Sequence, residues 1–179
     1  MNPAPNLVLV GPMGAGKTSI GRRLADRFGL QFVDADLHIE QRAGATITSI
    51  FDHVGEAGFR ERERAALAEL LGGGRQLVAT GGGAVLDAEN RRAMRERGFV
   101  VYLSAGLDAQ MKRLQRDRSR PLLQRADRED VLRQMARHRE PLYREVADMV
   151  METDGLTAID AASRLGMQLA GRWRIGVAA

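Results

Sequence analysis

The sequence contains no cysteine, only 4% aromatic residues and no long apolar run. Without cysteine, a disulfide framework and a thiolate metal site are excluded, and a reducing cytoplasm is the expected compartment. The few aromatic residues are not interleaved with basic ones, which argues against stacking platforms for nucleic-acid bases. No run approaches the ~20 apolar residues of a membrane span. The N-terminus lacks the charged and apolar regions of a secretory signal.

Lysine is also scarce, so arginine supplies nearly all of the positive charge behind the formal net charge of +4. This composition fits a nucleic-acid surface, arginines that face phosphate and carboxylate groups, or an ordinary solvated surface. The third interpretation accounts for most of the arginines. With 44% apolar residues, the chain is expected to form one monomeric domain over 1–179, with its core over about 6–170.

The strongest motif is a phosphate loop, G-x-x-x-x-G-K-[ST], at residues 11–18. An apolar run at 7–10 precedes it and predicts a buried strand, and a helical pattern follows it. A glycine turn into a helix N-terminus presents backbone N–H groups to a polyphosphate. Lys17 is expected to reach the β/γ-phosphates and Thr18 to ligate Mg²⁺. A chance match is the alternative, but both flanks favour a nucleoside triphosphate site.

Apolar runs that predict strands alternate along the chain with segments of helical periodicity. The predicted strands are 7–10, 31–33, 77–80, 99–103 and 149–151. The predicted helices are 17–28, 47–69 with a break at Gly55 and Gly58, 88–97, 107–114, 129–146 and 157–169. This alternation predicts an α/β fold with a parallel sheet covered on both faces, and ligands beyond the carboxyl ends of the strands. No element is expected in the tail, residues 171–179.

Two aspartates, Asp34 and Asp36, end the second predicted strand. On an extended chain their carboxylates would lie on the same side, close to the phosphate loop. One would hold Mg²⁺ through water, and the other would accept the proton of an attacking hydroxyl. The alternative is that one of them simply caps the following helix. The third strand lacks the terminal aspartate of a Walker B element, so Asp34 is the expected carboxylate for Mg²⁺.

Three glycines, Gly81, Gly82 and Gly83, follow the third predicted strand. They would let a ligand approach backbone N–H groups closely, although a bulge or tight turn is the alternative. Two arginines, Arg60 and Arg139, lie on separate predicted helices. Each alone is more often a surface residue or a local ion-pair partner, but together they would clamp a substrate carboxylate.

The basic, polar segment 116–128 reads as a loop between helices. It is either an ordinary solvated charge run or a lid that delivers an arginine to the transferring γ-phosphoryl group. The three histidines have no metal-ligand spacing among them, so we treat all three as structural or surface residues.

The combination of these motifs resembles the shikimate kinase family over roughly residues 6–170. The motifs are the phosphate loop, Asp34-x-Asp36, Phe59-Arg60, Gly81-Gly82-Gly83, Arg120-Pro121-Leu122-Leu123 and Arg139-x-Pro141-Leu142-Tyr143. They occur in the family's order and approximate spacing. The phosphate loop alone is shared by many nucleotide-binding families, whereas the whole combination is specific.

The resemblance implies a P-loop kinase fold like that of nucleoside monophosphate kinases, with a five-stranded parallel sheet and a mobile lid over about 114–128. It implies phosphorylation of the shikimate 3-hydroxyl by ATP with Mg²⁺, in the pathway to chorismate and the aromatic amino acids. The implied catalytic residues are Asp36, Lys17 and Arg120. The implied ATP-binding residues are Gly14, Ala15, Gly16, Lys17, Thr18, Ser19, Arg113 and Arg120. The implied shikimate-binding residues are Asp36, Arg60, Gly81, Gly82, Gly83 and Arg139, and the metal residues are Thr18 and, through water, Asp34.

One segment departs from the family pattern, because Glu152-Thr153-Asp154-Gly155 is acidic where members often carry basic or amide residues near adenine. Competing interpretations are another small-metabolite kinase, such as a gluconate or nucleotide kinase, and a nucleotide-dependent switch. A GTPase would need N-K-x-D, and no asparagine in the chain precedes a lysine. The expected partners are therefore shikimate and ATP, with no nucleic acid and no membrane.

Overall fold

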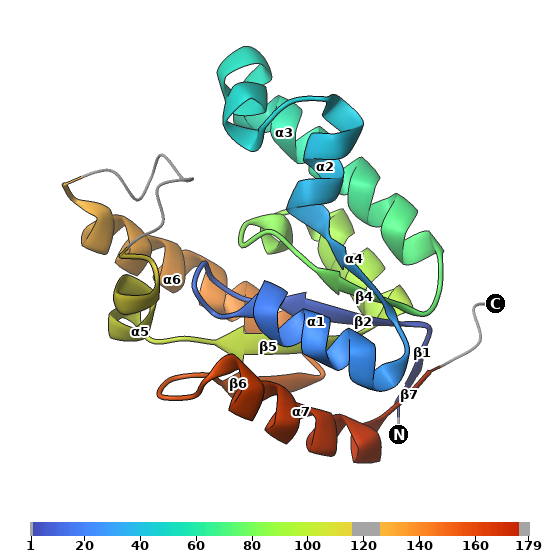
Figure 1. The fold of residues 1–179 in the computed structure, drawn as a ribbon. Coiled ribbons are helices and arrows are strands. Elements are labelled where there is room, and N and C mark those ends of the chain that lie inside the picture. Colours follow the sequence, from blue (N-terminus) through green and yellow to red (C-terminus); the bar gives the residue numbers. More distant parts are fainter. Residues whose placement is uncertain (1, 116–125, 176–179) are drawn as a thin grey trace.

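A parallel sheet in the order β3-β4-β2-β5-β6 forms the centre of the molecule (Figure 1). The computed structural model describes residues 2–115 and 126–175. The strands are β2 (Asn6–Val10), β3 (Gln31–Asp34), β4 (Gln76–Ala79), β5 (Gly98–Ser104) and β6 (Met149–Glu152). Leu7 of β2 lies beside Leu77 on one side and Phe99 on the other, and every pairing in this sheet is parallel. The predicted α/β fold with five parallel strands is confirmed.

Helices connect the strands at the positions that the periodicity predicts, with one addition. They are α1 (Lys17–Phe28), α2 (Ala35–Ala43), α3 (Ile47–Gly72), α4 (Ala88–Arg97), α5 (Leu107–Arg113), α6 (Arg128–Val146) and α7 (Ala158–Arg172), with a 3-10 turn η1 (Ala84–Leu86). The addition is α2, which follows β3 directly. Gly55 breaks α3 at φ 70° and ψ −176°, as predicted, whereas Gly58 stays helical.

Side chains of the central strand β2 alternate between two buried clusters, one on each face of the sheet. Leu7 and Leu9 pack with α1 and α7, and Val8 and Val10 pack with α3, α4 and α6. All four side chains are fully buried, as a strand covered on both faces requires. Figure 1 shows α1 and α7 side by side, and α2 with the first part of α3 standing away from the sheet.

The two ends of the described chain pair with each other, so the prediction of a tail without elements was wrong for residues 171–175. Helix α7 continues to Arg172, and β7 (Trp173–Ile175) forms a parallel pair with β1 (Asn2–Ala4). The Trp173 indole N–H donates to the Ala4 carbonyl at 3.1 Å, and its ring meets Phe28 edge-on with centroids 5.6 Å apart. A partner so distant in sequence leaves no local signal in the tail.

Within the described residues, none of the helices combines the length and the apolar character needed to cross a membrane.

Candidate active site

The candidate site lies at the carboxyl ends of three neighbouring strands, β3, β4 and β2. The phosphate loop joins β2 to α1, Asp34 ends β3, and Gly81 lies two residues beyond the end of β4. Because β4 lies between β2 and β3, the sheet itself gathers these segments at one edge. This is the edge at which open parallel sheets bind their ligands.

Gly16 of the phosphate loop is the N-cap of α1, and its φ of 92° lies in the left-handed region. The first N–H groups of a helix have no intrahelical partner and face outward as an anion site. The Lys17 ammonium donates to the carbonyls of Gly11 and Pro12, at 2.7 Å and 2.8 Å, and so lies over the loop. The N-terminus of α1 and the Lys17 ammonium therefore both lie at the phosphate loop.

Thr18 and Asp34, the two predicted metal residues, lie in contact. The Thr18 hydroxyl donates to Asp34 Oδ2 at 3.1 Å, while Asp34 Oδ1 accepts the backbone N–H groups of Asp36 and Leu37. Asp34 is thus also the N-cap of α2, as the alternative interpretation proposed. The expectation of an extended chain was wrong, because the cap starts the helix at once and places Asp36 in its first turn.

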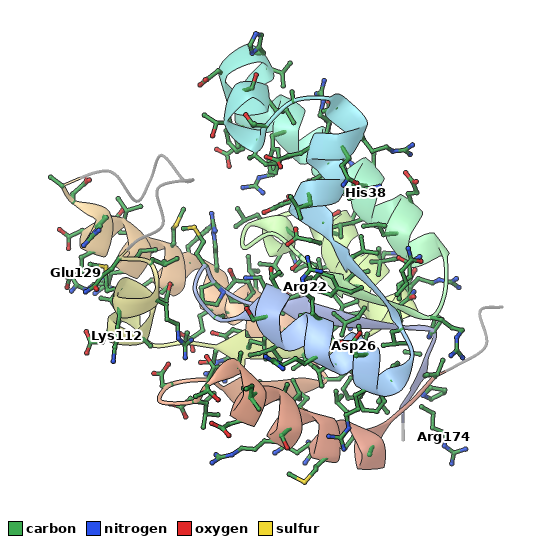
Figure 2. All side chains as sticks on the ribbon, viewed as in Figure 1. Arg22, Asp26, His38, Lys112, Glu129 and Arg174 are labelled. Atoms are coloured by element: carbon green, nitrogen blue, oxygen red, sulfur yellow. The ribbon has the colours of Figure 1, made fainter. Side chains whose placement is uncertain are left out.

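The Thr18 and Asp34 oxygens fit Mg²⁺, which prefers hard oxygen ligands and retains several waters and substrate phosphate oxygens. Across residues 2–115 and 126–175, no group of three or more His, Cys, Asp or Glu side chains could hold a metal. An ion at this position would therefore depend on one carboxylate, one hydroxyl and the phosphates. His38, labelled in Figure 2, has its Nε2 3.8 Å from Glu69 Oε2.

Three charged side chains from three helices meet around Gly81–Gly83. A Cβ on Gly81 would lie 2.7 Å from Asp36 Oδ1, and one on Gly83 would lie 2.5 Å from Arg60 Nη2. A Cβ on Gly82 would lie 3.5 Å from Arg139 Nη1 and 3.6 Å from the Gly11 carbonyl oxygen. Because these residues are glycines, the side chains of Asp36, Arg60 and Arg139 can lie close to the backbone. The same segment forms a turn in which the Ala84 N–H donates to the Gly81 carbonyl. The structure brings Asp36, Arg60 and Arg139 together beside the phosphate loop.

Sequence reasoning missed Glu63, which is buried next to Arg60. Arg60 Nη1 donates to Glu63 Oε1 at 2.7 Å, and a Cβ on Gly81 would lie 3.2 Å from Glu63 Oε2. Burial raises the pKa of the Glu63 carboxyl above its usual value, against the lowering effect of Arg60. The available signal was the spacing of three residues on one helix, which places an acid and a base side by side.

Arg60 also has an unused donor. Its Nε is buried and makes no hydrogen bond with any described residue, although its Nη atoms contact Glu63 and the exposed Glu56. Its guanidinium also lies over the Phe59 ring, 5.2 Å from the centroid. Buried donors are rarely left unpaired, and the Arg60 side chain as a whole remains 20% exposed, so its guanidinium can still pair with an anionic ligand such as a carboxylate.

Arg113 joins the middle of the phosphate loop, at Gly14, to the segment after β6. Its guanidinium donates to the Gly14 carbonyl at 2.8 Å, and to the hydroxyl and carbonyl oxygens of Thr153 at 3.0 Å and 2.5 Å. The neighbouring Asp154 carboxylate accepts the Gly106 N–H at the start of α5. The acidic segment that departs from the family pattern is therefore tied to α5 and, through Arg113, to the loop.

Most of the predicted lid, residues 116–125 with Arg120, lies outside the described residues. Leu114 and Leu132, on the flanks of that segment, share one apolar cluster with Met13 of the phosphate loop. Figure 2 labels Lys112 and Glu129 on the two packed helices α5 and α6 that carry these flanks.

Comparison with known proteins identifies the family. The shikimate kinase family model matches residues 13–170. A shikimate kinase of Stenotrophomonas maltophilia (strain K279a) is 62% identical over 174 residues, 97% of each chain, and one of Xanthomonas campestris pv. campestris (strain 8004) is 59% identical over 175 residues, 98% of this chain and 97% of the relative. The solved structure of a shikimate kinase from Acinetobacter baumannii in complex with shikimate is 47% identical, covers 94% of this chain and 95% of its own, and superposes with a TM-score of 0.89. The chain belongs to the shikimate kinase family.

Proposed function

We propose that this protein transfers the γ-phosphoryl group of ATP to the 3-hydroxyl of shikimate, yielding shikimate 3-phosphate and ADP. The observation that carries the proposal is the meeting of Asp36, Arg60 and Arg139 at Gly81–Gly83, next to the phosphate loop. A phosphate cradle alone accepts any triphosphate. Two cations and a carboxylate beside it select an acceptor that bears both a carboxylate and hydroxyl groups.

The two arginines supply the binding site for the acceptor carboxylate. The planar guanidinium of arginine pairs well with a carboxylate, and the Arg60 side chain remains 20% exposed beside Gly83. Glu63 and Phe59 hold the Arg60 side chain from two sides. An acceptor lacking the carboxylate, such as a neutral sugar, would gain no charged contact from Arg60 and Arg139.

Asp36 orients the acceptor hydroxyl and takes its proton. As the hydroxyl oxygen bonds to the γ-phosphorus, the bond from that phosphorus to the bridging oxygen of ADP breaks, and the proton passes to the carboxylate. Catalysis of this kind is mainly positioning and charge stabilisation. Lys17 and the α1 N-terminus bind the phosphates, and Mg²⁺ held by Thr18 and, through water, by Asp34 would neutralise their charge. Arg120 is proposed as a further phosphate-binding cation from the lid.

Transfer of labelled γ-phosphate from ATP tests the proposal, with shikimate, quinate, gluconate and a nucleoside monophosphate as acceptors. We expect Mg²⁺-dependent label on shikimate alone. Comparable label on gluconate or on the nucleotide would identify a different small-metabolite kinase and overturn the proposal. A monomeric, cytoplasmic enzyme is the accompanying prediction, and sedimentation of the purified protein tests the first part of it.

A further inference from the structure

Tyr143 ties three parts of the molecule together behind the candidate acceptor site. It lies on α6, is only 2% exposed, and its hydroxyl donates to the Gly82 carbonyl at 2.5 Å. Its ring stacks on Tyr102 of β5, with centroids 5.0 Å apart and planes at 27°. The side chain therefore links a helix, the glycine turn and the central sheet.

The same phenol contacts Arg139, which lies four residues earlier and hence on the same helix face. A Cβ on Gly82 would lie 3.5 Å from Arg139 Nη1 and 3.6 Å from the Tyr143 hydroxyl oxygen, so both groups close on one point. Burial raises the pKa of the Tyr143 phenol to about 12, and its hydrogen bond with Arg139 acts in the opposite direction. The phenol thus remains protonated and can donate to Gly82 while it accepts from Arg139.

Fixing the Gly82 carbonyl also fixes the N–H of the following residue. The peptide bond is planar and trans, so the Gly83 N–H points away from the side on which Tyr143 holds the carbonyl. Without this hydrogen bond, a run of three glycines would sample several backbone conformations. The Tyr143 hydroxyl therefore sets the direction of both the Gly83 N–H and the Arg139 guanidinium.

We propose that Tyr143 is a positioning residue for the acceptor, which it does not touch, and that it acts by holding the Gly82–Gly83 peptide and Arg139. This inference rests on the proposed function. The competing explanation is that Tyr143 only fills space in the core. The variant Tyr143→Phe distinguishes the two explanations, because it removes the hydroxyl and keeps the ring. Only a positioning role predicts an effect on the acceptor.

The chain offers a matched control, since Tyr102 is its only other tyrosine. Tyr102 is 4% exposed and belongs to the same ring stack, but its hydroxyl is paired with Ser104 on its own strand. Tyr102→Phe removes a hydroxyl from the same stack without touching Gly82 or Arg139. Thermal unfolding of both variants checks that each retains the fold.

Steady-state kinetics with both substrates separates the explanations. In Tyr143→Phe we expect the KM for shikimate to rise roughly threefold to tenfold, the size of one lost hydrogen bond, with the KM for ATP changed by less than about twofold. Tyr102→Phe should leave both values unchanged. An unchanged KM for shikimate in Tyr143→Phe, or the same rise in both variants, would overturn the inference.

A double-mutant cycle tests whether Tyr143 acts through Arg139. Calorimetric titration gives the shikimate affinity of the wild type, Tyr143→Phe, Arg139→Ala and the double variant. We expect a smaller effect of Tyr143→Phe in the Arg139→Ala background, and equal effects in both backgrounds would contradict a role through Arg139. Failure of the proposed function is visible separately, because the wild type would then not phosphorylate shikimate and the inference would fall with it.

Discussion

Glu63 accepts a hydrogen bond from Arg60 one helical turn away, with 2.7 Å between Oε1 and Nη1, at a position where the Glu63 side chain is 2% exposed. Arg60 also contacts Glu56 at 3.4 Å, but the Glu56 side chain is 65% exposed. One cation thus has a buried partner and an exposed one. The buried partner holds the guanidinium in place, and the exposed one contributes little.

Replacing the buried partner should destabilise the protein and weaken acceptor binding together. For Glu63→Ala we expect the free energy of unfolding to fall by roughly 2–4 kcal/mol, since a buried charge loses its partner, and the KM for shikimate to rise. The matched control is Glu56→Ala, for which exposed pairs predict a loss below about 1 kcal/mol. Denaturant unfolding measures the stability of both variants. Equal losses would contradict the difference between the buried and the exposed partner of Arg60.

The raised pKa of Glu63 predicts a pH dependence with a definite sign. Burial lifts this pKa above the ordinary 4.5, so the folded state binds the proton more tightly than the unfolded state. The stability from this group is then complete below that ordinary value and is lost as the pH rises through the folded pKa. We expect the difference in unfolding free energy, wild type minus Glu63→Gln, to decrease from acid to neutral pH. A difference that increases with pH would show the opposite shift.

Gly83 should be required for the position of Arg60 and not for the fold. Its backbone, at φ −96° and ψ 0°, is open to alanine, but the added Cβ would lie 2.5 Å from Arg60 Nη2. The guanidinium must then move, and we expect Gly83→Ala to raise the KM for shikimate roughly tenfold, the loss of about one charged hydrogen bond. Gly72→Ala is the control, because a Cβ there meets nothing within 4 Å. A variant with normal shikimate kinetics would show that Arg60 need not occupy its present place.

Asp34 should matter for Mg²⁺ more than for stability. Asparagine also caps helices well, so Asp34→Asn should preserve α2 and change the unfolding free energy by less than about 1 kcal/mol. Loss of the negative charge next to Thr18 should raise the Mg²⁺ concentration for half-maximal activity several-fold. Titration of activity with Mg²⁺ at fixed ATP measures this, and an unchanged midpoint would remove Asp34 from the metal site.

The parts of the fold with a local pattern were predictable, and the parts that depend on distant partners were not. Helix α1 occupies residues 17–28 as its four-residue spacing predicts, and Gly55 breaks α3. The strand pairing of Trp173–Ile175 depends on the N-terminus and leaves no signal nearby.

Within the site, each motif predicted a residue type but not its orientation. The sequence placed Asp34 and Asp36 together and offered a helix cap as the alternative, but it did not show which aspartate caps the helix. Glu63 and the Tyr143 hydroxyl were missed because both act on other side chains or on backbone. The Tyr143–Gly82 contact arises from tertiary packing, which a motif does not encode. The Arg60–Glu63 pair had a local signal, the three-residue spacing on one helix.

We propose that Asp36 serves the acceptor hydroxyl and not the nucleotide, and Asp36→Asn tests this role most directly. The measurement is the single-turnover transfer of labelled phosphate from ATP to shikimate, with ATP affinity determined by calorimetry on the same preparation. We predict a loss of transfer rate of at least ~100-fold, the usual contribution of a positioned base, with ATP affinity within about twofold of the wild type. Near-normal transfer in this variant would contradict the account.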